Sequence, residues 1–336
     1  MSDTIVSATQ LRQNPQDGSP HVVLLGAGAS RASFPQGDAN GRILPIMCDF
    51  VEVLDLAGSL RDAGIDPKEN FEVVYSRLVS DRLAGDLLQK LERRINSYFS
   101  ALTLPTTATH YDRLLLSLRS KDAIVTFNWD PFLFDAYRRN FEVTQGKLPG
   151  IYFLHGNVRI GCCPDHDEWG DRHAACTTCR NPYWDVPLLY PIEKKDYSTN
   201  HYIASAWREA KDSLGSALTL TIFGYGAPDS DADAVKLLRD GWFGRSNREA
   251  EHVEIIDTAD RQMLYGRWES FTPTLHLHFE SEFRNSRLWR WPRRSCESLF
   301  YPSIMGQPCE DFPLPNTSSL IELQQYCSEI ARHEQP

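Results

Sequence analysis

The sequence lacks any long apolar run: no stretch approaches the roughly 20 consecutive apolar residues of a membrane-spanning helix. Residues 1–20 also lack the basic and then apolar pattern of a secretion signal. We therefore expect a polar, flexible leader there and a cytoplasmic protein with no membrane partner. Because the cytoplasm is reducing, the eight cysteines are better explained as thiols or metal ligands than as disulfides.

Net positive charge is also lacking. The chain has 45 acidic and 35 basic side chains, a formal charge of −10, which argues against a nucleic-acid partner. One segment departs from this balance: FRNSRLWRWPRR, residues 283–294, has five arginines among aromatic residues. We interpret it as a solvated or partner-facing part of the C-terminal tail, with nucleic-acid contact as the less favoured alternative.

Six short apolar runs, rich in β-branched residues, predict buried strands. They are HVVLL (21–25), AIVTF (123–127), IYFL (151–154), LTLTIF (218–223), HVEII (252–256) and LHLHF (275–279). Helical periodicity fills the intervals between them. Buried strands that alternate with helices are typical of an α/β fold, and we expect a Rossmann-like, doubly wound and mostly parallel sheet.

Two intervals break the regular alternation. Residues 48–120 are too long for a single crossover and predict an inserted helical module. Residues 156–190 are rich in Cys, His, Pro and Trp and predict a small zinc-binding module. We therefore expect one main domain over 21–280, followed by a C-terminal tail and helix over 281–336 that form a candidate interaction surface.

The first predicted strand runs directly into GAGAS, residues 26–30. Glycines at a strand-to-helix turn let backbone N–H groups approach a pyrophosphate, whose charge the helix N-terminus favours. The pattern is weak by itself, because Arg31 replaces the third glycine of the usual dinucleotide motif and a structural tight turn would also use these glycines. Its position after the first buried strand favours a nucleotide site.

Polar side chains stand at the carboxyl ends of the next two predicted strands. Asn128 follows AIVTF and His155 follows IYFL, at the edge where parallel α/β sheets bind ligands. Asn128 and His155 are therefore the candidate catalytic residues. Asp130 also lies at this edge, although a role as the cap of a helix that starts at Pro131 explains it as well.

The stretch CCPDHDEWGDRHAACTTC, residues 162–179, predicts a structural zinc site. The expected ligands are a CxxC pair and a cysteine–histidine pair with the same gap: Cys176, Cys179, Cys163 and His166. Three thiolates and one imidazole complete a tetrahedron and leave no open position for water. Cys162 or His173 could substitute in this set, and redox chemistry or plain buried thiols are the alternatives.

Four motifs stand in a fixed order: GAGAS, TFNWD (126–130), LHG (154–156) and the cysteine module. Over about 21–280 this order resembles the sirtuin (silent information regulator two) superfamily. The resemblance implies a Rossmann-type domain with helical and zinc insertions, which consumes NAD as a substrate. FGYGAPDSDAD (223–233) and VEIID (253–257) fall where that family contacts the nucleotide. The NAD-binding residues that it implies are Gly26, Ala27, Gly28, Ser30, Asp130, Gly224, Tyr225 and Asp257.

Departures from the family bear on the reaction. Sirtuin deacylases follow the GAG turn with Gly-Ile-Pro-Asp-Phe-Arg, where this chain has RASFPQGDANGRILP (31–45). Phe127 replaces the glutamine of their Thr-Gln-Asn-Ile-Asp motif. VPLLYPIEKKDY (186–197) replaces their Phe-Gly-Glu strand, which pairs with the acyl-lysine peptide. The chain is in these respects more similar to the sirtuin-like NAD hydrolases of bacterial antiviral systems.

That resemblance implies an NAD glycohydrolase, which cleaves the nicotinamide–ribose bond to give nicotinamide and ADP-ribose, and an antiphage effector that depletes NAD when triggered. Asn128 would hold the ribose hydroxyls or the attacking water, and His155 would act as the base. The alternatives are an NAD-dependent protein deacylase or ADP-ribosyltransferase, and a non-catalytic NAD or ADP-ribose sensor. We expect a homo-oligomer or a complex with a co-encoded defence protein.

Acidic residues near these motifs have simpler explanations as well. The cluster Asp229, Asp231 and Asp233 is better explained as the start of a helix than as a metal site. Asp257 fits the cap of a helix that starts at Thr258 nearly as well as a ribose contact. Asp38 would reach the nicotinamide end of the site.

Overall fold

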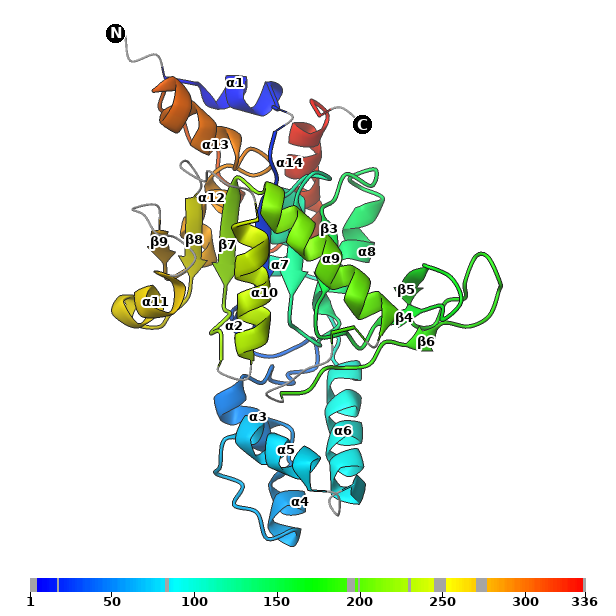
Figure 1. Cartoon of the computed structure of the whole chain (residues 1–336). Helices are drawn as coiled ribbons and strands as arrows, with labels where there is room; N and C mark the ends of the chain where they lie inside the picture. The colour runs from blue at the N-terminus through cyan, green and yellow to red at the C-terminus, as the bar shows by residue number, and fades with distance from the viewer. Residues whose placement is uncertain are drawn as a thin grey trace.

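Six parallel strands form the central sheet (Figure 1). The computed structural model describes residues 5–16, 18–81, 85–191, 197–198, 200–228, 231–244, 252–269 and 277–334. The strands are β1 (His21–Leu25), β2 (Ala123–Thr126), β3 (Gly150–Phe153), β7 (Thr219–Phe223), β8 (His252–Ile256) and β9 (Leu277–Glu280). Their order is β3-β2-β1-β7-β8-β9, and every neighbouring pair is parallel. The predicted fold class is therefore confirmed; of the predicted last strand, residues 275 and 276 lie outside the described residues.

All five residues of β1, β7 and β8 are buried, because helices and loops cover both faces of the sheet. This burial explains why the sequence shows continuous apolar runs instead of alternation. The chain leaves β1 toward β2 and β3 and then returns to β7 on the other side of β1. The direction of winding thus reverses between β1 and β7, and such a switch point opens a crevice at the carboxyl ends of the strands.

Helices lie on both faces of this sheet. Figure 1 shows α9 (His201–Ser216) and α10 (Ala232–Trp242) in front of the strands and α7 (His110–Ser117) behind them. Helix α7 contacts α8 (Phe132–Phe141), α12 (Arg287–Arg290) and α14 (Leu320–Ala331). Two further helices, α2 (Ala27–Ser33) and α11 (Arg261–Trp268), follow β1 and β8 in the chain.

The long interval between α2 and α7 forms a group of helices below the sheet in Figure 1. It contains η1 (Met47–Asp49), α3 (Phe50–Val53), α4 (Ala57–Asp62), α5 (Phe71–Ser80) and α6 (Gly85–Ser100). Phe50 packs against Phe71 and Phe99, with ring centroids 4.8 and 6.4 Å away. These rings belong to the same apolar core as the sheet, so the inserted helices are fixed against it.

A second, smaller sheet projects from the side of the molecule (Figure 1). Its strands β4 (Ile160–Cys162), β5 (Trp169–Asp171) and β6 (Trp184–Asp185) are antiparallel, in the order β5-β4-β6. This sheet carries the cysteine-rich stretch. The division into a main domain, two inserted modules and a tail remains our proposal.

The N-terminal segment differs from the polar leader that we expected. Ser7 caps α1 (Ala8–Gln13) in a capping box with Gln10, and Leu11 is buried. Val6 forms a parallel bridge with Cys309 of the C-terminal segment, whose remaining elements are η4 (Phe283–Asn285), α13 (Glu297–Phe300) and the π-turn η5 (Tyr301–Met305). The described part of the leader therefore packs against the C-terminal segment.

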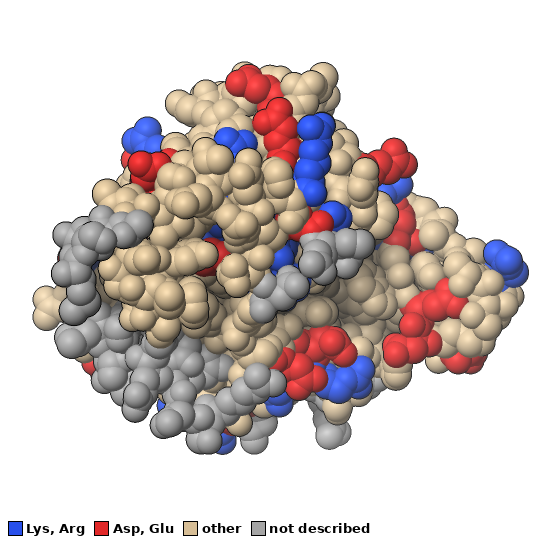
Figure 2. Space-filling model, turned by 90° about the horizontal axis from the view of Figure 1, so that it is seen from above, with Lys and Arg blue, Asp and Glu red and all other residues tan. Residues whose placement is uncertain are grey.

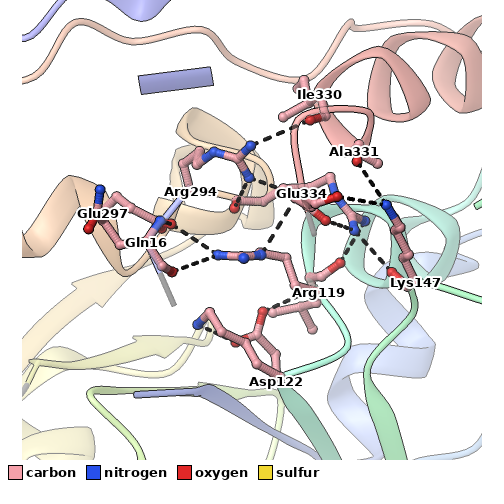
Figure 3. Close-up of polar contacts among 12 residues, drawn as sticks. Gln16, Arg119, Asp122, Lys147, Arg294, Glu297, Ile330, Ala331 and Glu334 are labelled. Carbon is pink, nitrogen blue, oxygen red and sulfur yellow. Dashed lines mark hydrogen bonds and ion pairs between the residues drawn. The ribbon is translucent and has the colours of Figure 1, made fainter. Parts of the chain in front are cut away.

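The arginine-rich segment 283–294 is not a solvated tail throughout. Arg293 and Arg294 are 1% and 0% exposed, and both bind Glu334 near the C-terminus, with N–O distances of 2.5 to 2.8 Å. Arg294 also donates to the Leu11 carbonyl at 3.0 Å. Figure 3 shows this cluster. Our interpretation is wrong for these arginines, because they are internal counter-ions that join both ends of the chain to the core.

Charges of both signs are mixed over the face that Figure 2 shows, and the described basic side chains form no single patch there. Within the described ranges, no helix has the length and apolar content needed to cross a membrane.

We expect Glu334→Gln to lower the free energy of unfolding by about 3–5 kcal/mol, because it leaves two fully buried guanidinium groups without their counter-ion. Burial works to raise the pKa of Glu334, but Arg293 and Arg294 outweigh it and hold that pKa below its usual value. The contribution is therefore present at neutral pH and is lost as the pH falls through the folded-state pKa. Urea denaturation measures both effects.

The matched control is Glu329→Gln on α14, whose side chain is 60% exposed and lies 3.8 Å from Arg12. Exposed pairs of this kind contribute about 0–1 kcal/mol. Equal losses in the two variants would contradict the assigned role of the cluster.

Candidate active site and metal centre

Two glycine turns meet at the switch point of the sheet. The Gly28 N–H donates to the Gly224 carbonyl at 2.9 Å, and the Gly26 N–H donates to Phe223 O at 3.1 Å. A Cβ on Gly28 would lie 2.8 Å from Gly224 Cα, and one on Gly26 would lie 2.6 Å from Gly224 O. Gly224 itself has φ +59°, and its Cβ would lie 2.1 Å from Ala29 N. Only glycine allows the two turns to come this close.

A cavity of about 650 Å³ opens at this edge, between the sheet and the inserted helices. The structure brings all ten predicted catalytic and NAD-binding residues into its wall: Gly26, Ala27, Gly28, Ser30, Asn128, Asp130, His155, Gly224, Tyr225 and Asp257. The insertion also lines the cavity, with the apolar side chains of Met47, Phe50 and Phe99 and the polar ones of Asn70 and Glu72. The strand ends and the insertion thus both line the cavity, and each contributes polar and apolar side chains.

The backbone of the first turn is only partly available to a ligand. The N–H groups of Gly26 and Gly28 already donate to the carbonyls of Phe223 and Gly224, at the end of β7. The Ala27 N–H donates no hydrogen bond within the described part of the chain, and Ala27 is exposed at the start of α2. Of these three amides, Ala27 is the one that can face an anion, and the glycines shape the wall.

Asn128 is held by three oxygens from two other elements. Its Nδ2 lies 2.9 Å from Gly26 O, 3.0 Å from Ser30 Oγ and 3.1 Å from Tyr111 OH. Its Oδ1 accepts no hydrogen bond from the residues that the structure describes. The amide is therefore fixed through its nitrogen, and its oxygen is the group that can bind a ligand in the cavity.

Ser30 and Asp130 support Asn128 from inside the protein. Ser30 Oγ donates to Asp130 Oδ2 at 2.6 Å and lies 2.5 Å from Tyr111 OH. Burial raises the pKa of Asp130 to about 6, although Ser30 and the Phe132 N–H work to lower it. Burial also raises the pKa of Tyr111, which keeps its proton. The hydroxyl of Ser30, one of the predicted NAD-binding residues, is occupied in this network.

His155 lies just beyond the end of β3, and its ring is set between aromatic side chains. The imidazole meets Phe127 edge-on, with centroids 4.6 Å apart, and lies nearly parallel to Tyr197 at 6.1 Å. Phe127 in turn stacks on Tyr225, with centroids 4.4 Å apart and planes inclined by 18°. His155 is 5% exposed and faces the cavity, so its ring orientation is fixed by packing.

Two residues of the hydrogen-bond network around Asn128 and Asp130 were not predicted from the sequence. Tyr111 lies on α7, far from any motif, and nothing in its local sequence pointed to the site. Asn157 donates to the Asp130 carbonyl at 2.7 Å and so fixes the loop after β2. It follows His155 by two residues, and this position beyond the same strand end is the signal that indicates it.

The acidic residues near the motifs differ in whether they cap a helix. Asp257 lines the cavity and accepts the Ala259 N–H at 2.9 Å; it is not a helix cap, because α11 begins at Arg261 with Asp260 as its N-cap. Asp231 is the N-cap residue of α10, as the helix-start interpretation predicted, and Asp229 lies outside the described residues.

Asp38 closes its own loop. It accepts backbone N–H groups of Asn40, Arg42 and Thr103 at 2.8 to 2.9 Å and does not line the cavity. The expectation that Asp38 reaches the end of the site is therefore wrong.

The small sheet gathers the four expected metal ligands, Cys163, His166, Cys176 and Cys179, with all ligand atoms within 4.8 Å of one another. Three of the separations are 3.4, 3.5 and 3.7 Å. A tetrahedron with Zn–S bonds of about 2.3 Å has edges of about 3.8 Å, so the cluster fits structural zinc. Cys162 and His173 are not part of this described cluster.

No family model and no curated protein matches the chain. A solved Sir2 homologue in complex with NAD is 12% identical, has a TM-score of 0.37, and covers 84% of this chain and 91% of its own. A mutant Sir2 homologue with ADP-ribose is 10% identical, with a TM-score of 0.40 and coverages of 97% and 95%. A mutant Sir2 with a deacetylated p53 peptide and 3′-O-acetyl ADP-ribose is 14% identical, with a TM-score of 0.38 and coverages of 81% and 91%. The chain thus has structural similarity to Sir2 structures at low identity. No residue of this chain takes its role from these structures.

We expect Gly224→Ala to lower the free energy of unfolding by about 1–3 kcal/mol, because its Cβ would force the two turns apart. The control is Gly226→Ala in the same loop, where a Cβ would meet, among the described residues, Arg267 Nη1 alone, at 3.4 Å. Chemical denaturation compares the two variants, and equal stability would contradict the role of the glycine contact.

We expect the purified chain to hold about one zinc ion. Cys163→Ser should lose it, whereas Cys162→Ser at the neighbouring position should keep it, because only Cys163 belongs to the cluster. Elemental analysis of both variants decides this. Retention of zinc by Cys163→Ser would contradict the assigned ligand set.

Proposed function

We propose that this chain is an NAD glycohydrolase, which hydrolyses NAD to nicotinamide and ADP-ribose in the cavity at the switch point. The observation that carries the proposal is the shared wall of that cavity: Asn128 and His155, from adjacent strands, lie in it together with the glycine turns. The volume of about 650 Å³ falls within the range of roughly 300–1,000 Å³ that small-molecule sites occupy.

The cavity is lined by groups that suit the different parts of NAD. Asp257, at the end of β8, can accept hydrogen bonds from the adenosine ribose, and the Ala27 N–H can face the pyrophosphate. The nicotinamide end would then lie toward Asn128, His155 and the apolar side chains that the insertion contributes. Zinc has no part in the chemistry, because four protein ligands leave it no open position; it would hold the small sheet together.

Hydrolysis breaks the bond between ribose C1′ and the nicotinamide nitrogen. The bonding electron pair leaves with nicotinamide, which becomes neutral, and a water oxygen bonds to C1′. The Asn128 Oδ1 orients a ribose hydroxyl or the water, and His155 takes the proton that the water loses and passes it to solvent. Nicotinamide is a good leaving group, so orientation and charge stabilisation make up most of the catalysis.

Two features favour water over an acyl-lysine peptide as the acceptor. Residues 186–191 form no strand, and the N–H groups of Val186 and Leu189 already donate to the Ile160 and His155 carbonyls, at 3.2 and 2.9 Å, so this part of the segment has fewer free backbone groups with which to pair a peptide. Phe127 puts an apolar ring beside His155 where sirtuin deacylases have an amide. The motif resemblance supports the narrower proposal that the activity depletes NAD in antiviral defence, as an oligomer or with a co-encoded partner.

We expect Asn128→Ala and His155→Ala each to reduce NAD hydrolysis by about 10²–10⁴-fold. His201→Ala, at an exposed histidine on α9, is the control and should retain activity. Release of nicotinamide and ADP-ribose, followed by chromatography, measures turnover. Full activity in both site variants would contradict the assignment. Tight NAD binding without turnover would favour the sensor alternative.

A further inference from the structure

Asp231 faces the cavity, although it stands at a helix start. It is the N-cap residue of α10, but its side chain makes no capping hydrogen bond. Instead, Oδ2 accepts the Tyr225 hydroxyl at 3.0 Å, and Oδ1 lies 4.0 Å from His155 Nε2. Asp231 is 6% exposed and lines the same cavity as His155.

We propose that Asp231 is the positioning residue of His155: its carboxylate raises the proton affinity of the imidazole and stabilises the imidazolium that forms when His155 takes a proton. This inference builds on the proposed function, in which His155 is the base. It gives Asp231 a role beyond the helix start that its sequence position suggests.

The surroundings strengthen the pair. An opposite charge within about 4–6 Å shifts a pKa by about one to three units, and the effect is larger where water is excluded. Phe127 and Tyr197 contact the imidazole, and Trp207 packs against both of these rings. The carboxylate is in turn held by Tyr225, which burial keeps protonated by raising its pKa, so that it remains a donor to Asp231.

Other titratable groups lie around this pair, but none of those in the described residues lies at ion-pair distance from the His155 imidazole. Burial raises the pKa of Tyr197, so it is neutral at working pH. Glu72, Asp257 and Arg267 line the cavity, and Asp130 is engaged with Ser30 behind Asn128. Asp233 lies two residues along α10 and is exposed. Among the residues that the structure describes, Asp231 is the carboxylate at ion-pair distance from His155.

The test measures the pKa of His155 by NMR, in the full-length chain labelled at histidine, with the His155 signal identified by its loss in His155→Gln. We expect Asp231→Asn to lower this pKa by about one to three units, because asparagine keeps the shape and the capping preference but not the charge. Asp233→Asn removes the same charge two residues away and should leave the pKa almost unchanged. If Asp231→Asn folds poorly, Asp231→Ser repeats the measurement.

Turnover supplies a second readout. The acid limb of kcat/KM against pH should move to lower pH in Asp231→Asn, because a weaker base becomes protonated only at lower pH. A merely structural role would lower the rate without moving that limb. An unchanged His155 pKa in Asp231→Asn, or an equal fall in Asp233→Asn, would overturn the inference. Failure of the proposed function is a separate result: the wild type would then not hydrolyse NAD, while NMR would still report the pair.

Discussion

The close contact between the two glycine turns at the switch point is the constraint on which the site depends. The turn at Gly26 and Gly28 touches the turn at Gly224, with no room for a side chain between them. Asn128 is fixed because its Nδ2 binds the Gly26 carbonyl. Tyr225 directly follows Gly224, and its ring stacks on Phe127, which meets His155. This backbone contact therefore contributes to the positions of both candidate catalytic side chains.

The site and the charge cluster around Glu334 use buried polar groups in different ways. Around Asn128, hydroxyl, amide and carboxylate groups are joined by hydrogen bonds and one amide oxygen is left for a ligand. Around Glu334, the arginines are fully internal and bind chain segments far apart in the sequence. The first arrangement leaves one hydrogen-bond acceptor unused within the described residues and suits binding. In the second, the buried charged groups are hydrogen-bonded to one another and to backbone carbonyls, which stabilises the fold.

The sheet, the cavity wall and the metal cluster could be predicted from sequence because each depends on a local pattern. Apolar runs define strands, strand ends define the crevice, and cysteine spacing defines the ligands. Tyr111 and the burial of Arg293 could not be predicted in this way, because their partners are distant in the chain. The arginine-rich segment stood out in the sequence, but its composition does not show which of its arginines are internal. Asp231 looked like a helix start, which it is, but its side chain has a tertiary role that the local sequence does not show.

A crystal structure of the chain with ADP-ribose would test the central claim most directly, because it locates the ligand without requiring turnover. The account predicts ADP-ribose in the cavity at the switch point, with its pyrophosphate beside the Ala27 N–H and its terminal ribose within hydrogen-bond distance of Asn128. ADP-ribose bound elsewhere, or in the cavity with its terminal ribose out of reach of both Asn128 and His155, would contradict it.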